Sequence, residues 1–235
     1  GDTNWTFNHL TFGDGSGATA STKTGTGNIT VSGNLLIQAS QTLNLDNDTW
    51  TVTGNFTRSG VFNANTSTLN LGSSGQTLSG STSFYTLTKI VTAANTLTLT
   101  ALNNFTITNS LTLKGASAQR LTVTSSDPTD QSILRLLGPN GLQDLDWLTV
   151  KRIDSSSPGL NLIPANTVSG DCTTATNWQC GGGGTYIWDG TGANGNWSSP
   201  ANWDVGRSPV GDTTAIVTIV SGASFNPILE TLTTV

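Results

Sequence analysis

The sequence predicts an all-β protein, and within that class an irregular right-handed parallel β-helix, a solenoid in which successive coils of the chain stack on one another. Three observations predict it. About half of the 235 residues are Thr, Ser, Asn or Gly, with 42 Thr, 25 Ser, 22 Asn and 27 Gly. Apolar residues alternate with Thr or Asn over most of the chain, and whole strand–turn–strand phrases recur. A β-sandwich built of meander strands is the alternative fold.

The composition favours strands and tight turns. Thr is β-branched and fits a pleated strand, whereas Asn and Gly supply the positive-φ positions of turns. Only 10% of the residues are charged, against roughly 25% in an average soluble domain. Hydroxyl and amide groups therefore provide the solubility, which suits extracellular or cell-surface material. The net charge is −5 and the nine Lys and Arg are scattered, which argues against a nucleic-acid partner. No apolar run approaches the roughly 20 residues of a membrane span.

Period-two alternation identifies the strands. It is clear in Thr42–Leu45, Thr49–Thr53, Thr96–Thr100 and Leu121–Thr124, where aliphatic or aromatic residues point one way and Thr or Asn the other. Gly-Asn, Ser-Gly and Asn-Ser pairs separate such segments. Before residue 130 no stretch shows a convincing helical period, so we expect almost no helix.

The strands recur as whole phrases. Val31–Leu35 matches Val52–Phe56 at an offset of 21, and Thr42–Leu45 reappears as Thr68–Leu71 at an offset of 26. Offsets of about 20 to 28 residues suit one coil of a parallel β-helix, in which each coil covers its neighbour. The varying offset predicts an irregular solenoid. A sandwich does not need such phrases to return.

The chain divides into three parts in this interpretation. Residues 1–180 form the solenoid, residues 181–184 are a four-glycine linker, and residues 185–235 are a Trp-rich β module that starts or continues a solenoid of the next copy. Cys172 and Cys180 lie eight positions apart, and in an exported protein we expect them to form a disulfide. Two thiols and the single distant His9 do not provide a tetrahedral metal site.

Several phrases resemble bacterial surface proteins. Ser83–Thr88, followed by Asn95–Leu97 and Asn109–Leu113, resembles the repeated phrase of autotransporter passengers and filamentous-haemagglutinin-type adhesins. Tyr186–Gly190, with the later Asn196–Ser198, resembles the opening of autotransporter-associated β-strand repeats. The resemblance implies a parallel β-helix, export and surface display, and it brings no catalytic residues.

The two ends of the sequence run into each other. Gly211–Val235 has the pattern of a solenoid start, and Gly1–Gly13 has the pattern of its next rungs. Open solenoid ends must be capped or stacked, and no charged amphipathic cap is visible. We therefore expect copies to join head to tail, as separate subunits or as tandem repeats of a longer chain. The joining residues would be Trp5, Phe7, Leu10, Phe12, Ile216, Val217, Ile219, Ile228 and Leu232.

Three groups of residues are candidates for binding. Trp188, Trp197 and Trp203 would either stack on sugar rings or pack the entry of the C-terminal module, and packing is favoured. The ladder of Thr96, Thr98 and Thr100 could bind ice, but a solvated strand face is favoured, because the irregular coil length argues against a flat repeated array. The paired aspartates suit either calcium or ordinary turns, and turns are favoured. These pairs are Asp46 with Asp48, Asp127 with Asp130, and Asp144 with Asp146.

The function predicted from these features is structural. The chain would be a subunit or module of an extracellular fibre assembled end to end, without enzymatic activity and, calcium aside, without a cofactor. The alternative is a surface adhesin that binds glycan. A polysaccharide-active β-helix enzyme and an ice-binding protein rank lower, because one Glu and one His offer little for catalysis and the coil length is irregular.

Overall fold

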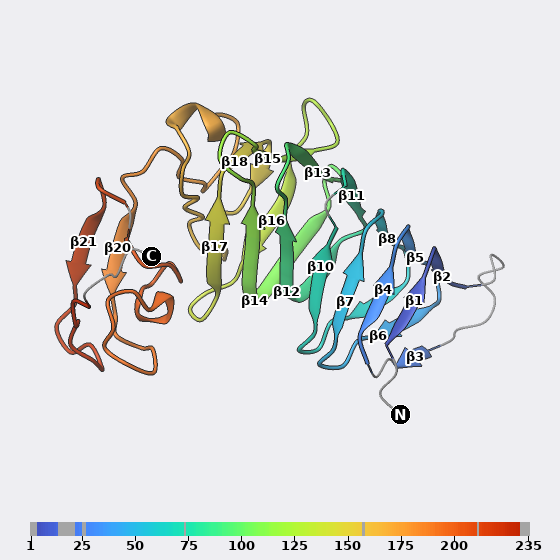
Figure 1. Ribbon diagram of the computed structural model, residues 1–235, viewed down its shortest axis with the longest axis horizontal. Helices are drawn as coiled ribbons and strands as arrows, with labels where there is room; N and C mark the ends of the chain where they lie inside the picture. The colour runs from blue at the N-terminus through green and yellow to red at the C-terminus, as the bar shows by residue number, and fades with distance from the viewer. Residues whose placement is uncertain are drawn as a thin grey trace.

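The computed structural model describes residues 4–13, 22–24, 27–72, 74–156, 158–210 and 212–230. It confirms an all-β fold with long parallel sheets, as expected for a β-solenoid. Strands stack side by side along the long axis, from β1 (Trp5–Phe7) at one end to β21 (Ile216–Ile219) at the other (Figure 1). The helices in the described part of the chain are two short 3-10 turns, η1 (Ser169–Cys172) and η2 (Pro200–Asn202).

Each coil contributes strands to three faces, and neighbouring coils pair in parallel. The first face contains β1, β4 (Ile29–Val31), β7 (Thr49–Val52), β10 (Thr68–Leu71), the later part of β12 (Thr82–Ile90), the later part of β14 (Asn104–Lys114) and β17 (Leu142–Asp146). The second face contains β2 (Leu10–Phe12), β5 (Leu35–Ile37), β8 (Phe56–Arg58), β11 (Gln76–Ser79), β13 (Asn95–Leu99), β15 (Leu121–Ser125) and β18 (Leu148–Lys151). The third face contains β3 (Thr22–Thr24), β6 (Thr42–Asn44), β9 (Val61–Asn63), the early parts of β12 and β14, β16 (Ser132–Leu136) and β19 (Ile153–Asp154).

The alternation of residue types explains why these segments are strands. In β7, Trp50 and Val52 are buried while Thr49 and Thr51 remain half-buried on the outer surface. The same two-residue period recurs in β13 and β15, so each coil adds a layer of Leu, Val, Ile or Phe to one continuous core. Burial of these layers from water is the main favourable contribution to stability.

Polar side chains at the corners hold consecutive coils in register. Between the first and second faces, the backbone N–H of Asn34 donates to Nδ1 of His9 at 3.0 Å. One coil further on, the N–H of Asn55 donates to Oδ1 of Asn34 at 2.9 Å, and the N–H of Thr77 donates to Oδ1 of Asn55 at 2.8 Å. The recurring Gly-Asn pairs thus mark one corner of the solenoid, where an amide oxygen replaces a strand carbonyl as acceptor.

One of the two predicted repeats is confirmed and the other is wrong. Val31 lies opposite Val52 and Leu35 opposite Phe56, so the offset of 21 joins neighbouring coils. Thr42–Leu45 and Thr68–Leu71, in contrast, lie on different faces, because β6 pairs with β9 and β10 pairs with β7. Strands on all three faces alternate buried and exposed side chains in the same way. A Thr-Leu-Asn-Leu segment therefore does not show to which face of the solenoid it belongs.

The C-terminal residues form a second small core stacked on the last solenoid coils. Here β20 (Thr185–Trp188) pairs in parallel with β21. The core consists of Tyr186, Trp188, Trp203 and Val205 together with Ile163 from the solenoid side. This Trp-rich core therefore shares the buried side chain of Ile163 with the residues that precede it.

Candidate functional site

The solenoid ends at β1, β2 and β3, which are the outermost strands of the three faces. Trp5 in β1 is 54% exposed, and its ring stacks on that of Phe7 with centroids 6.2 Å apart. Leu10 and Phe12 in β2 are only partly buried against the core. Among the described residues no strand pairs with the outer edges of β1, β2 and β3, so this end combines free strand edges with apolar side chains that the next layer would normally cover.

The opposite end has the same character. β21 is the outermost strand of its two-stranded sheet, and all four of its residues are exposed. Ile216 is 62% exposed and Ile219 is 53% exposed, and Val217 and Ile228 also face solvent. Figure 1 places β21 and β1 at opposite ends of the molecule. Of the predicted joining residues, Leu232 lies outside the described residues.

The C-terminal module is joined to the solenoid by a seam of buried hydrogen bonds around Gln143 of β17. Its Nε2 donates to the carbonyl of Val205 at 2.6 Å and to the carbonyl of Asn161 at 2.9 Å. Its Oε1 accepts from the N–H of Ile163 at 2.7 Å, and its own N–H donates to the carbonyl of Gly206 at 3.0 Å. The side chain thus connects both bodies from a position that is 4% exposed.

Gly206 also shows how closely the two bodies approach. Its φ is +64°, and a Cβ atom there would lie 1.8 Å from the carbonyl oxygen of Gly141. No L-residue with a side chain fits without moving one backbone away from the other. The seam is therefore a close backbone contact and not a loose association.

The four glycines predicted as a linker adopt a defined conformation with hydrogen bonds to Asp212. Gly181, Gly182 and Gly183 all have positive φ, at 90°, 79° and 75°. This conformation turns the N–H groups of Gly183 and Gly184 toward the carboxylate of Asp212, each at 3.2 Å. Such a run of converging N–H groups is a backbone nest for an anion. Glycine is needed for its backbone conformation here, and not for flexibility.

Asp212 is held in its ionised form by this nest. Burial works to raise its pKa, but hydrogen bonds from Thr214, Gly183 and Gly184 outweigh burial and leave the pKa below its ordinary value. Tyr186 donates its hydroxyl to the same carboxylate at 3.1 Å, and burial raises the pKa of Tyr186 to about 12. Asp212 therefore anchors the start of β20.

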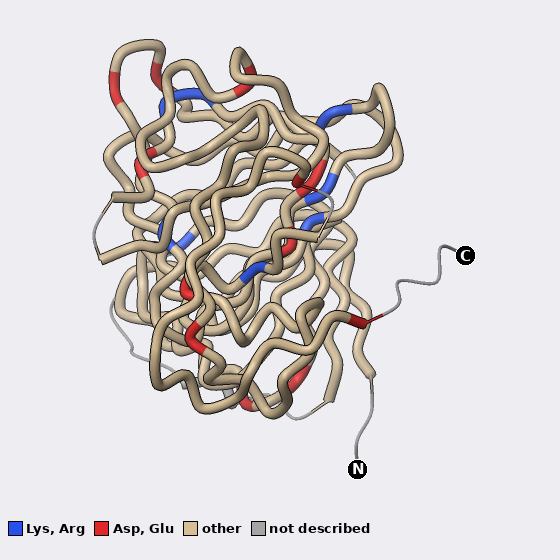
Figure 2. The backbone as a smooth tube through the Cα atoms, turned by 90° about the vertical axis from the view of Figure 1, so that its left-hand side faces the viewer, with Lys and Arg blue, Asp and Glu red and all other residues tan. Residues whose placement is uncertain are grey.

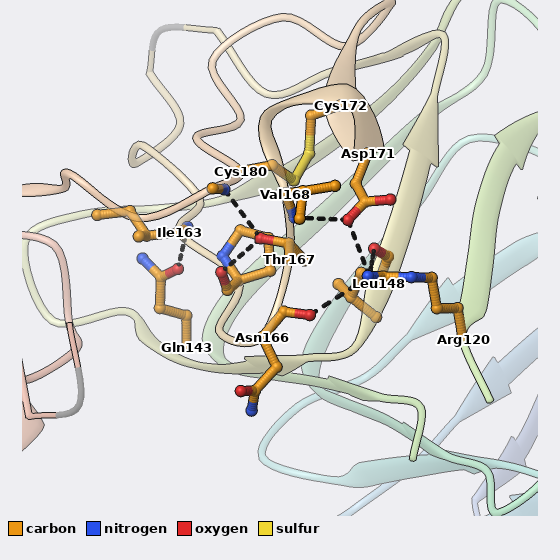
Figure 3. Close-up of a disulfide and its surroundings, with 12 residues drawn as sticks. Arg120, Gln143, Leu148, Ile163, Asn166, Thr167, Val168, Asp171, Cys172 and Cys180 are labelled. Atoms are coloured by element: carbon orange, nitrogen blue, oxygen red, sulfur yellow. Dashed lines mark hydrogen bonds and ion pairs between the residues drawn. A yellow bond between two sulfur atoms is a disulfide. The ribbon is translucent and has the colours of Figure 1, made fainter. Parts of the chain in front are cut away.

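Cys172 and Cys180 are joined in a disulfide next to the seam (Figure 3). It ties η1 to the residues that precede the glycine nest. Asp171, which directly precedes Cys172, accepts from the N–H of Val168 at 2.7 Å and pairs with Arg120 at 2.9 Å. The Arg120 guanidinium also lies 5.6 Å from the ring centre of Trp147. The disulfide thus fixes a loop that packs against the second face.

The three tryptophans of the C-terminal module pack against each other. Trp188 and Trp203 are 0% and 1% exposed, and their rings meet edge to face at 5.1 Å. Trp197 is half-buried and stacks on Trp188 at 5.9 Å. The indole N–H of Trp188 donates to Phe225 O at 2.9 Å. In this geometry Trp188 and Trp203 fill a core, and neither offers a free ring face to a sugar.

The carboxylates of Asp127, Asp144 and Asp146 lie in local polar contacts, whereas Oδ2 of Asp48 is buried without a hydrogen-bond partner among the described residues. Asp127 accepts from the hydroxyl of Thr129 at 2.6 Å and from the N–H groups of Thr129 and Asp130 at 2.7 and 3.0 Å, and these hydrogen bonds lower the pKa of Asp127. Asp144 pairs with Lys114 at 2.6 Å. No group of three or more His, Cys, Asp or Glu that could hold a metal ion occurs among the described residues. Figure 2 shows both signs of charge dispersed over the backbone.

Two buried polar side chains were missed in the sequence. Lys89 is 0% exposed and donates to the carbonyl of Ser74 at 3.0 Å and to Oε1 of Gln76 at 2.6 Å. Gln76 in turn donates to the carbonyl of Val52 at 2.8 Å. The signal was present, because Lys89 follows the inward-facing Leu87 by two residues and therefore points inward.

No family model matches the chain, and the comparisons with curated proteins and with solved structures found no similar protein. Within the described residues, no helix is long and apolar enough to cross a membrane.

Proposed function

We propose that this chain is a non-enzymatic structural module of an extracellular fibre, in which copies stack end to end. The observation that carries the proposal is the pair of open ends. Each presents the outermost strand of a sheet with exposed apolar side chains, Trp5 at one end and Ile216 and Ile219 at the other. Joining two such ends would pair the free strand edges and cover the apolar side chains in a single step.

The contact would be heterologous, because one end of a copy meets the other end of the next. Contacts of this kind continue without limit unless a rotation closes them into a ring. Both β20–β21 and β1–β4 pair in parallel, so a strand added at either end would continue the pattern already present. The same end-to-end contact would form between separate subunits and between tandem copies within one longer chain. The surface location rests on the low charge, the disulfide and the resemblance to surface proteins.

Assembly can be tested by sedimentation over a range of protein concentrations, with electron microscopy of the same samples. The wild-type chain should form species that lengthen with concentration. Trp5→Ser and Ile216→Asp should each shift the distribution to monomer, since each removes one half of the joint. Ile90→Ser is the matched control, because Ile90 is 55% exposed but lies at the end of β12 on the lateral surface.

The tandem form has its own test. In a chain of two copies joined directly, the amides of Trp5–Phe7 in the second copy should be more protected from hydrogen exchange than in the single chain. A single chain that stays monomeric at all concentrations, together with unchanged exchange in the two-copy chain, would overturn the proposal.

A further inference from the structure

The third face is interrupted between two consecutive coils. β3, β6 and β9 form a separate three-stranded sheet that ends at β9 (Val61–Asn63). The next coil places Thr82–Phe84 on this face, but these residues pair only with Phe105–Ile107 on their far side. The backbone ladder that runs along the rest of this face is therefore absent between β9 and β12.

The interruption is confined to the outer surface, because the core beneath it is closed. The rings of Phe62 in β9 and Phe84 in β12 meet at 5.7 Å across the break, at an interplanar angle of 63°. At one corner, Nη1 of Arg58 donates to the carbonyl of Ser81 and spans the same break. An added β-strand would have to separate these contacts, so the break is a groove and not a slot for a peptide strand.

Two adjoining hollows, of about 410 and about 310 Å³, lie along this groove. Phe62, Asn63 and Ser83 line both of them, Arg58 lies in one, and Tyr85 lies in the other. No Asp or Glu lines either hollow, and Arg58 is the only charged residue of the lining. On a chain with a net charge of −5, this groove is a local positive site.

The lining carries hydrogen-bonding groups that have no partner within the described structure. Asn63 donates its Nδ2 to Asn44, which leaves Oδ1 of Asn63 open. Asn104 accepts from Thr106 through Oδ1, which leaves its Nδ2 open. The hydroxyls of Ser83 and Tyr85 likewise line the groove. Donors and acceptors thus line the same groove as Phe62, whose side chain is 8% exposed.

We propose that this groove binds an acidic oligosaccharide, with a uronate carboxylate at Arg58 and the neighbouring sugar hydroxyls on Asn63, Ser83, Asn104 and Tyr85. Nη1 of Arg58 donates to Ser81 and its Nε is buried, so Nη2 is the group that would donate a charge-assisted hydrogen bond to the carboxylate. A sugar also needs donors and acceptors together with an apolar contact. This inference goes beyond end-to-end assembly and does not depend on it, because the groove lies on a lateral face. In a fibre the groove would recur in every copy, and repeated weak sites gain avidity.

The test is a titration of the purified chain with trigalacturonate and with a neutral trisaccharide of the same length. Calorimetry reports affinity, and NMR shifts of the Asn63 and Asn104 side-chain amides report the location. Trigalacturonate should bind saturably and the neutral trisaccharide at least tenfold more weakly. Arg58→Gln should weaken trigalacturonate binding at least tenfold and leave the neutral sugar unaffected.

Two further variants separate binding from folding. Asn104→Asp places a negative charge in the groove without removing a core contact, and it should also weaken trigalacturonate binding. Lys151→Gln removes an exposed positive charge outside the groove and should have no effect. Equal binding of the acidic and neutral sugars, or equal binding by wild type and Asn104→Asp, would overturn the assignment. Saturable binding of an extended Thr-rich peptide in place of either sugar would also overturn it.

Discussion

Gln143 donates a hydrogen bond from Nε2 to the backbone carbonyl of Val205 at 2.6 Å, and this contact joins the last coils of the solenoid to the Trp-rich module. The same side chain serves Asn161 and Ile163, so one amide satisfies three backbone groups from a buried position. The side chain of Gln143 therefore determines whether these three buried backbone groups of the seam have a hydrogen-bond partner.

Gln143→Glu should destabilise the protein while preserving the shape of the side chain. The carboxylate would face the carbonyls of Asn161 and Val205 without a proton to donate. A buried polar group left unsatisfied costs about 1–3 kcal/mol, and a charged one costs more. The free energy of unfolding in urea measures the loss. Gln119→Glu, at an exposed position, is the control, and an equal effect of the two substitutions would contradict the role assigned to the seam.

Removal of the disulfide should lower stability by about 2–3 kcal/mol, because the unfolded chain gains the freedom of the opened loop. The measurement compares urea unfolding of the wild type with that of a Cys172→Ser, Cys180→Ser double variant. Reductant should weaken the wild type to the level of the variant and leave the variant unchanged. Stability that does not respond to reductant would show that the bond contributes nothing to the loop.

Lys89 should make stability rise with pH in the alkaline range. Burial lowers its pKa in the folded protein to about 8, whereas its ordinary value is 10.5. Between these two pKa values the unfolded chain binds more protons than the folded one, so the free energy of unfolding increases as the pH rises through this window. This contribution is lost as the pH falls through the folded pKa.

The measurement for Lys89 is the difference in unfolding free energy between the wild type and Lys89→Met from pH 7 to pH 11. Taking the difference removes the opposite effect of Tyr186, whose pKa is raised and whose contribution is lost above its ordinary value of 10.0. A difference that does not change with pH would mean that burial does not disfavour the charged form of this lysine.

Trp188→Ala should cost about 3–5 kcal/mol, the usual range for removing a buried Trp side chain. Trp197→Ala should cost clearly less, since Trp197 is only half-buried. Near-ultraviolet circular dichroism during urea unfolding follows the loss of the aromatic core. If both variants remained as stable as the wild type, the tryptophans would not form the core of the C-terminal module.

The sequence predicted the strands and their inward faces because a two-residue period records burial directly. Val31 and Val52 could be matched across coils because the Gly-Asn corner that follows each of them returns unchanged. The assignment of Thr42–Leu45 failed because the alternation is the same on all three faces. Corner geometry, and not strand pattern, distinguishes the faces.

The seam and the groove could not be predicted in the same way. The glycine run predicted only a linker, because the sequence does not show that Asp212, 29 residues beyond Gly183, accepts the N–H of Gly183. The groove depends on a missing ladder between Phe62 and Phe84, although both segments look like ordinary strands. Both features depend on contacts between residues far apart in the sequence, and the local alternation of residue types does not show which distant residues meet.

The disulfide has a mechanical consequence for any fibre built from this chain. A tensile load applied at the termini would peel coils away from one another and lengthen the polypeptide. Cys172 and Cys180, eight residues apart, are joined by a disulfide beside the seam. Because this bond would carry the force, the residues between the two cysteines would not be stretched and would add no length. Under load the polymer would therefore lengthen through coils held only by backbone ladders, whereas the loop closed by the disulfide would keep its length in every copy.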